Sequence, residues 1–177
     1  MNTSKGTSTR HHEAAILRDI LQLELSTWGL YRCLADTAAT AANRREAITL
    51  GSDHRQHIIA LRTRLALLGA TSPRLPPPRR LQLWGLLLLG WMGSNRRIVD
   101  ALIRAEGQLR QACLTLPTDV LGPGSRSLVQ RILADTVAHT TQVARLATAA
   151  ERLDNVAVLD DAGDYKVTSK HWVFARL

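Results

Sequence analysis

A proline-rich stretch near the middle of the chain restricts its fold more than any other feature. Four prolines fall within residues 71–80 (TSPRLPPPRR). Proline lacks a backbone N–H and biases the residue before it towards extended geometry, so no helix runs through such a stretch. The 177 residues are enough for one domain and few for two. The sequence therefore predicts one domain made of two halves joined by a central linker.

Both halves show the apolar spacing of amphipathic helices. Leucine and alanine dominate the apolar residues, aromatic residues make up only 4% of the chain, and no β-branched run suggests a strand. Asn43 and Glu46 resemble a capping box that opens the second helix, and Gly69 is a typical residue just after a helix end. The predicted helices cover residues 12–42, 43–68, 81–116 and 125–153.

These segments predict an all-α fold, a four-helix bundle built from two helical hairpins. We expect the bundle over residues 12–153, a flexible N-terminus over residues 1–11 and a C-terminal tail over residues 154–177. The bundle is compatible with a homo-oligomer as well as with a monomer.

Residues 81–93 (LQLWGLLLLGWMG) form the most apolar window of the chain. This window falls short of the roughly 20 residues that a helix needs to cross a bilayer. We expect it to be the buried first part of the third helix, bent at its glycines, with Trp84 and Trp91 in the core. A membrane contact in which residues 81–92 lie in the plane of the interface is the less favoured alternative, which the two tryptophans would suit.

The chain has a formal net charge of +8, and 20 of its 23 basic residues are arginines. The arginines are spread along the whole chain, and no basic run has interleaved aromatic residues. We assign them to solvated helix faces and expect no dedicated nucleic-acid surface.

The cysteines and the N-terminal residues indicate in which cellular compartment the protein is expected. Cys33 and Cys113 have neither a metal-ligand spacing nor the density of a disulfide framework, so we expect small buried apolar residues. The N-terminal residues lack the continuous apolar segment of a secretory signal. The cytoplasm is the expected location.

A carboxylate and a histidine recur at the same spacing in both halves. Asp53 and His57 are four residues apart in the second predicted helix, and Asp135 and His139 are four apart in the fourth. Residues four apart share one face of a helix. Leucine, isoleucine and valine lie on the same stripe around each pair, although Arg64 also falls near the first. Both pairs are therefore predicted to face the interior, where an unpartnered charge is costly.

A glutamate precedes each pair at one common distance. Glu24 precedes His57 by as many positions as Glu106 precedes His139, so a single sequence offset relates the two sets. Apolar residues surround Glu24 at helical spacing, with Tyr31 two turns later, and we expect both to face inward. The pattern indicates an internal duplication of one hairpin.

Two such hairpins form the layout of carboxylate-bridged two-metal sites in bundle cores. Carboxylate oxygens bridge and neutralise the ions, while imidazoles cap each metal and leave positions open for oxygen or water. Iron is the expected cofactor, with manganese and zinc as alternatives. The candidate metal ligands are Glu24, Asp53, His57, Glu106, Asp135 and His139.

The pattern departs from the usual Glu-x-x-His motif of these sites. His54 and Thr136 occupy the places where that motif has its glutamates, and neither is a carboxylate. Asp53 and Asp135 lie one residue earlier and have shorter side chains. A second hypothesis therefore stays open, in which the pairs are intrahelical hydrogen bonds of a metal-free bundle and the repeat is the relic of a duplication.

The chain is similar to the ferritin-like, rubrerythrin-related bundle proteins of bacteria, and within them to an uncharacterised four-helix-bundle family. The similarity covers about residues 13–150, and it implies a diiron or dimanganese site whose direct ligands are Glu24, His57, Glu106 and His139. Functions in that superfamily range from iron storage to peroxide reduction and oxygen-dependent hydroxylation. The residues that carry the resemblance are Glu24 with Tyr31, Gly90–Met92, Glu106, the Leu116–Pro117 turn and His139.

A weaker resemblance is to the demethoxyubiquinone hydroxylases, which are membrane-associated bundles of duplicated hairpins. Glu24 with Tyr31 and the stretch Leu83–Gly85 carry it. The expected function is a metal-binding bundle, a diiron-type oxidoreductase or an iron- or peroxide-handling protein. The alternatives are a metal-free stress or partner-binding module and a membrane-associated ubiquinone-type hydroxylase.

Overall fold

The computed structural model describes residues 3–91, 95–117 and 119–160, and within these ranges it contains α-helices and no strand. The all-α prediction is confirmed, with five helices in place of four. The helices are α1 (Thr3–Thr37), α2 (Ala41–Leu67), α3 (Pro77–Trp91), α4 (Asn95–Thr115) and α5 (Pro123–Asp160).

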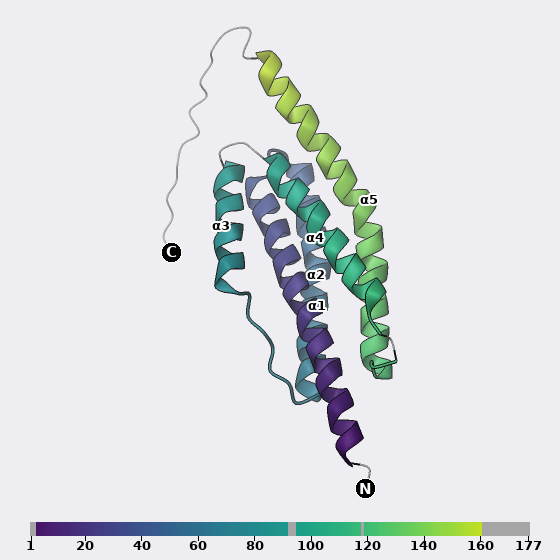
Figure 1. Ribbon diagram of the computed structural model, residues 1–177. Helices are drawn as coiled ribbons and strands as arrows, with labels where there is room; N and C mark the ends of the chain where they lie inside the picture. The colour runs from purple at the N-terminus through teal and green to yellow at the C-terminus, as the bar shows by residue number, and fades with distance from the viewer. Residues whose placement is uncertain (1–2, 92–94, 118, 161–177) are drawn as a thin grey trace.

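The helices pack as two antiparallel hairpins with one extra helix outside them (Figure 1). One hairpin is α1 with α2, and the other is α4 with α5. The hairpins meet where α1 contacts α4 and where α2 contacts α5. The short helix α3 lies on the outer side of α1 and α4, and an extended segment leads to it from the end of α2.

The ends of α2 are set by two local motifs. Thr40 is the N-cap, because its backbone is extended and its hydroxyl accepts a hydrogen bond from the Asn43 N–H at 3.1 Å. The predicted capping box of Asn43 and Glu46 is therefore wrong, since the helix begins earlier. Gly69 has the positive φ of 71° expected of a glycine after a helix end, and the Ala70 N–H bonds to the Leu65 carbonyl.

The third predicted helix is divided in the structure. It forms α3 and α4, and residues 92–94 between them lie outside the described ranges. Proline suits the first turn of a helix, so α3 begins at Pro77 within the predicted linker. At the other helix ends, α1 begins at Thr3, before the predicted start, and α5 continues to Asp160, beyond the predicted end.

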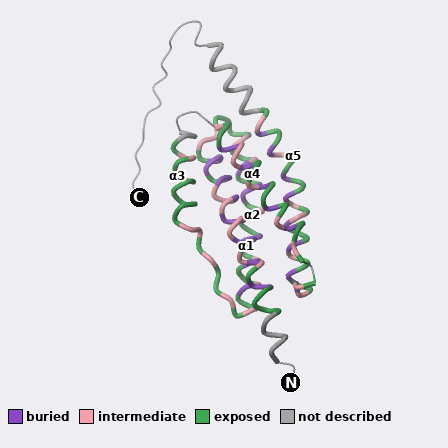
Figure 2. Tube along the Cα trace, in the orientation of Figure 1, coloured by how far each residue is buried: buried purple, intermediate pink, exposed green. Residues whose placement is uncertain are grey.

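Helix α3 is covered on one side only, as Figure 2 shows by its largely exposed and intermediate residues. Leu83 and its neighbours Leu86 and Leu87 pack on the bundle. Leu81, Trp84 and Leu88 are 74%, 67% and 58% exposed. The expectation that Trp84 is a core residue is wrong, because α3 lies against the outside of an already closed bundle. The side chain of Trp91 lies outside the described part. Of the described helices, none combines the length and hydropathy needed to span a bilayer.

The buried apolar residues form two clusters along the bundle. One cluster includes Leu17, Leu61 and Ile132, and the other includes Leu34 and Leu102. On α2, α4 and α5, the buried glutamate and histidine residues fall between the positions that enter the two clusters. The core is thus two apolar layers with one polar layer between them.

A second polar contact joins three helices at one end of the bundle. Arg64 on α2 donates from Nη2 to Glu13 Oε1 on α1 at 3.2 Å and from Nε to Ser125 Oγ on α5 at 2.7 Å. Ser125 also donates to Glu13. The arginine that falls near the stripe around His57 therefore has its own partners.

Candidate metal centre

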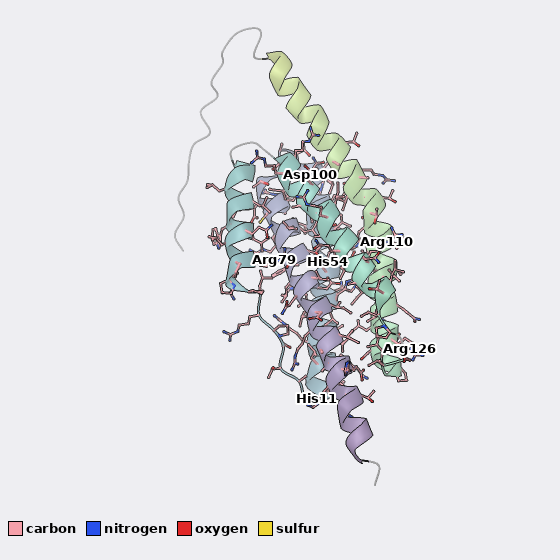
Figure 3. The ribbon with its side chains drawn as sticks, in the orientation of Figure 1. His11, His54, Arg79, Asp100, Arg110 and Arg126 are labelled. Carbon is pink, nitrogen blue, oxygen red and sulfur yellow. The ribbon has the colours of Figure 1, made fainter. Side chains whose placement is uncertain are left out.

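Five ionisable side chains meet in the polar layer, and each is at most 3% exposed. They come from the four long helices, so the layer exists only when both hairpins are in contact. In Figure 3, His54 lies within the bundle, whereas the labelled Arg79, Arg110 and Arg126 lie at its surface. The five residues are Glu24 on α1, His54 and His57 on α2, Glu106 on α4 and His139 on α5.

His54 lies between the two glutamates and contacts both. Its Nδ1 is 2.7 Å from Glu24 Oε2, and its Nε2 is 3.0 Å from Glu106 Oε1. Ionised carboxylates only accept hydrogen bonds, so the ring donates from both nitrogens and carries a positive charge in this arrangement. Burial lowers the pKa of His54, but the hydrogen bonds with Glu106 and Glu24 outweigh it and raise that pKa to about 9.

His57 and His139 each link a buried glutamate to an aspartate of the other hairpin. His57 Nδ1 is 3.0 Å from Glu24 Oε1, and its Nε2 is 2.9 Å from Asp135 Oδ2. His139 Nε2 is 3.2 Å from Asp53 Oδ2. The two aspartate side chains are 43% exposed, so they form the outer edge of the layer. The aspartates therefore bond across the bundle and not to the histidine four residues on in their own helix.

Tyr31 on α1 faces inward, as expected, and contacts Glu106 on α4. Its hydroxyl donates to Glu106 Oε1 at 2.6 Å, and its ring stacks on that of His54 with centroids 5.2 Å apart. Burial and the charge of Glu106 raise the pKa of Tyr31, so the phenol keeps its proton. Burial also raises the pKa of Glu106, but the imidazoles of His139 and His54 lower it further, to about 2.

The layer contains two polar atoms that lack a partner among the described residues. They are Glu106 Oε2 and His139 Nδ1, and both are buried; the 3.4 Å contact of His139 Nδ1 with Glu106 Oε1 does not have hydrogen-bond geometry. A buried carboxylate oxygen and an imidazole nitrogen left unpaired in this way are costly in a folded protein. These two atoms are also the kind of donors that hold a transition metal.

The donor atoms form two overlapping groups that fit a metal ion. One group is Glu24, His54 and His57, and the other is His54, Glu106 and His139. Within each group, one ligand atom from every residue lies within 4.8 Å of the others. Two imidazoles and one carboxylate are the donor set of non-haem Fe(II) sites, and imidazole also suits zinc and copper. His54 belongs to both groups.

Four of the six predicted ligands therefore lie in these groups, namely Glu24, His57, Glu106 and His139. Asp53 and Asp135 lie one step farther out, where each accepts from the outer nitrogen of a group histidine. Carboxylates in that place orient metal-binding histidines in many proteins. The sequence did not predict the part played by His54, although its position in the Glu-x-x-His frame was the available signal.

The outer residues of the layer have the same residue type in both halves of the chain, whereas the central residues differ between the halves. The same sequence offset that relates the two glutamates also relates Tyr31 to Cys113 and His54 to Thr136. Thr136 donates to the Ile132 carbonyl of its own helix at 2.7 Å. Burial and the nearby charge of Glu24 raise the pKa of the Cys113 thiol to about 12. The stacked rings of Tyr31 and His54 in the first half thus correspond to the smaller side chains of Cys113 and Thr136 in the second half.

Comparisons with protein-family models, with curated proteins and with solved structures found no match. The geometry consequently has to carry the functional argument. Over the described residues, it shows an all-helical bundle of five helices with two buried groups of histidine and glutamate that could hold metal ions.

Proposed function

We propose that this protein is a ferritin-like bundle that binds a transition metal, with iron as the first choice, and that it acts as an oxidoreductase on dioxygen or peroxide. The observation that carries the proposal is the pair of buried atoms without a hydrogen bond, Glu106 Oε2 and His139 Nδ1, within a layer of carboxylates and imidazoles. A cation bound by both atoms removes two unsatisfied groups, each of which costs about 1–3 kcal/mol.

Each residue of the layer has a distinct part in this proposal. Glu24 and Glu106 supply the negative charge that a divalent ion needs, and His57 and His139 supply neutral nitrogen donors. Bound iron supplies one-electron redox chemistry that the protein side chains lack. Tyr31 fixes the orientation of Glu106 through its hydroxyl hydrogen bond.

The aspartates connect the layer to solvent. Asp135 and Asp53 are half-buried, and each contacts a histidine whose other ring nitrogen faces a buried glutamate. Hydrogen bonds run from Glu24 through His57 to Asp135 and so link the buried centre to the surface. The α2–α5 side of the bundle is therefore the side from which protons reach the centre.

A groove between α1 and α2 brings small molecules close to the layer from another side. Its volume is about 270 Å³, and Tyr31 lies on its lining with Arg32 and Arg55. Tyr31 also stacks on His54, so this one residue contacts both the groove and the centre. Oxidants as small as dioxygen or hydrogen peroxide match an approach of this kind.

Metal analysis of the purified protein tests the proposal. Protein from iron-supplemented cells should contain stoichiometric metal, and His57→Ala with His139→Ala should remove it. The matched control is His11→Ala with His12→Ala, because these exposed histidines bind metal only adventitiously. Iron, zinc and manganese that are all substoichiometric in the wild type would remove the proposal.

One observation favours the metal-free alternative, a helical bundle that acts as a stress or partner-binding module. His54 and His57 each contact carboxylates through both ring nitrogens, so most of the layer is satisfied by its own hydrogen bonds. In that case neither a chelator nor added iron, zinc or manganese changes the melting temperature. A metal-dependent rise in melting temperature that the His57→Ala, His139→Ala variant lacks would exclude it.

A further inference from the structure

Both ring nitrogens of His54 face candidate metal-binding groups at the same time. We propose that its imidazole bridges two metal ions, one held with Glu24 and His57 and the other with Glu106 and His139. This inference rests on the proposed metal-binding function and deepens it, because it fixes the number of ions and the group that joins them.

The first argument is the direction of the two nitrogens. Nδ1 faces Glu24 at 2.7 Å and Nε2 faces Glu106 at 3.0 Å, so the two edges of one ring are turned to two different carboxylates. Each carboxylate has a further histidine beside it. His57 Nδ1 lies 3.0 Å from Glu24, and His139 Nδ1 lies 3.4 Å from Glu106. Each nitrogen of His54 thus faces two further donors, one glutamate and one histidine.

The second argument is the position of His54 in the internal repeat. The outer donors form equivalent pairs, Glu24 with Glu106 and His57 with His139. His54 has no such counterpart, because Thr136 takes the equivalent place and turns its hydroxyl to the Ile132 carbonyl. Two equivalent half-sites with one unique imidazole between them form a pair of sites that share a ligand. The ring centroids of His57 and His139 lie 6.0 and 5.0 Å from that of His54.

The third argument is the balance of charge. When two divalent ions bind, both N–H protons of His54 and the Nδ1 proton of His57 leave to solvent, so the His54 ring becomes an imidazolate and His57 a neutral donor. The ring and the two glutamates then carry three negative charges against four positive ones. The aspartates that contact His57 and His139 add two negative charges at the outer edge. The layer therefore stays within one charge of neutral, as a buried site must.

A titration of chelator-treated protein with Cu(II) tests the bridge. Copper(II) binds nitrogen donors most tightly among the divalent first-row metals, and its unpaired electron reports on a neighbouring ion. We use His11→Ala with His12→Ala as the background to remove the exposed imidazoles of the described residues. We expect two copper ions per chain and the loss of most of the low-temperature EPR signal, because the imidazolate couples the two spins.

Two substitutions complete the test. His54→Gln should remove the coupling, so that any copper still bound gives its full EPR signal. His57→Gln should leave one copper with an uncoupled signal, and it keeps the test decisive if His54→Gln fails to fold by circular dichroism.

The outcomes separate the bridge from the metal site itself. No specific copper binding would overturn the proposed function together with the bridge. A single ion per chain, or two ions with full uncoupled signals, would overturn the bridge alone and leave the proposed function standing.

Discussion

Raising the pH should destabilise the metal-free protein through His54. This side chain is fully buried and faces Glu24 and Glu106, with the rings of Tyr31, His57 and His139 around it. Its pKa is about 9 in the folded protein and 6.5 when unperturbed. A folded-state pKa above the unfolded value means that folding favours the protonated ring. The resulting stability is fully present below pH 6.5 and is lost as the pH rises through 9.

The size of the effect follows from the same two values. Each tenfold change in proton affinity corresponds to about 1.4 kcal/mol, so the shift from 6.5 to about 9 is worth about 3 kcal/mol. His57 adds to the loss, because its pKa is also raised: burial lowers it, but Glu24 and Asp135 raise it more. Glu106 affects stability only in acid. Its pKa is about 2 in the folded protein and 4.5 when unperturbed, so its stabilising effect is lost only as the pH falls below 4.5. His54 and Glu106 hold each other's charge, so their contributions are not summed.

Urea denaturation in the presence of EDTA at pH 6, 7.5 and 9 measures this loss. We expect the free energy of unfolding to fall by about 3 kcal/mol between the first and last pH. His54→Gln should flatten most of the slope, whereas His12→Gln, which changes an exposed histidine, should leave it unchanged. A wild-type free energy that agrees within about 0.5 kcal/mol at pH 6 and 9 would refute the assignment of a buried imidazolium between the glutamates.

Three further predictions concern the helices around the centre. Thr40→Ala should cost about 1 kcal/mol in denaturant unfolding, because it removes the N-cap of α2; an unchanged midpoint would contradict this. Relative to Gly85→Ala, which adds a methyl group in open space, Gly29→Ala should cost about 1–3 kcal/mol, since its new methyl group would lie 2.6 Å from Leu83 Cδ1 of α3. Anionic vesicles should shift the fluorescence of exposed Trp84 to the blue, because Arg80, which lines the same groove, attracts lipid headgroups; added salt should reverse the shift, and Trp84→Phe should lack it.

The sequence predicted an all-helical chain and the inward side of Glu24, His57, Glu106 and His139, because helical periodicity depends only on spacing along one chain. The buried positions of Glu24, His57, Glu106 and His139 agree with that reasoning. The partner of each aspartate could not be predicted in the same way, since it depends on how far apart α2 and α5 lie and how each is rotated.

Two other differences have similar causes. His54 was not predicted as a ligand because the Glu-x-x-His motif has a carboxylate at that position, yet its length and two nitrogens let it reach both glutamates. Trp84 was placed in the core from hydropathy alone. Hydropathy cannot show that α1, α2, α4 and α5 already close the bundle and leave α3 with one covered face.

The polar layer between the two apolar clusters fixes how the hairpins align along their axes. Leucine-rich surfaces alone accept several alignments, because one apolar side chain replaces another with little change in energy. Sliding one hairpin by a single helical turn, about 5.4 Å, would move Glu106 away from His54 and place its charge among leucines. The buried carboxylates and imidazoles that could hold a metal ion therefore also select one native alignment of the hairpins.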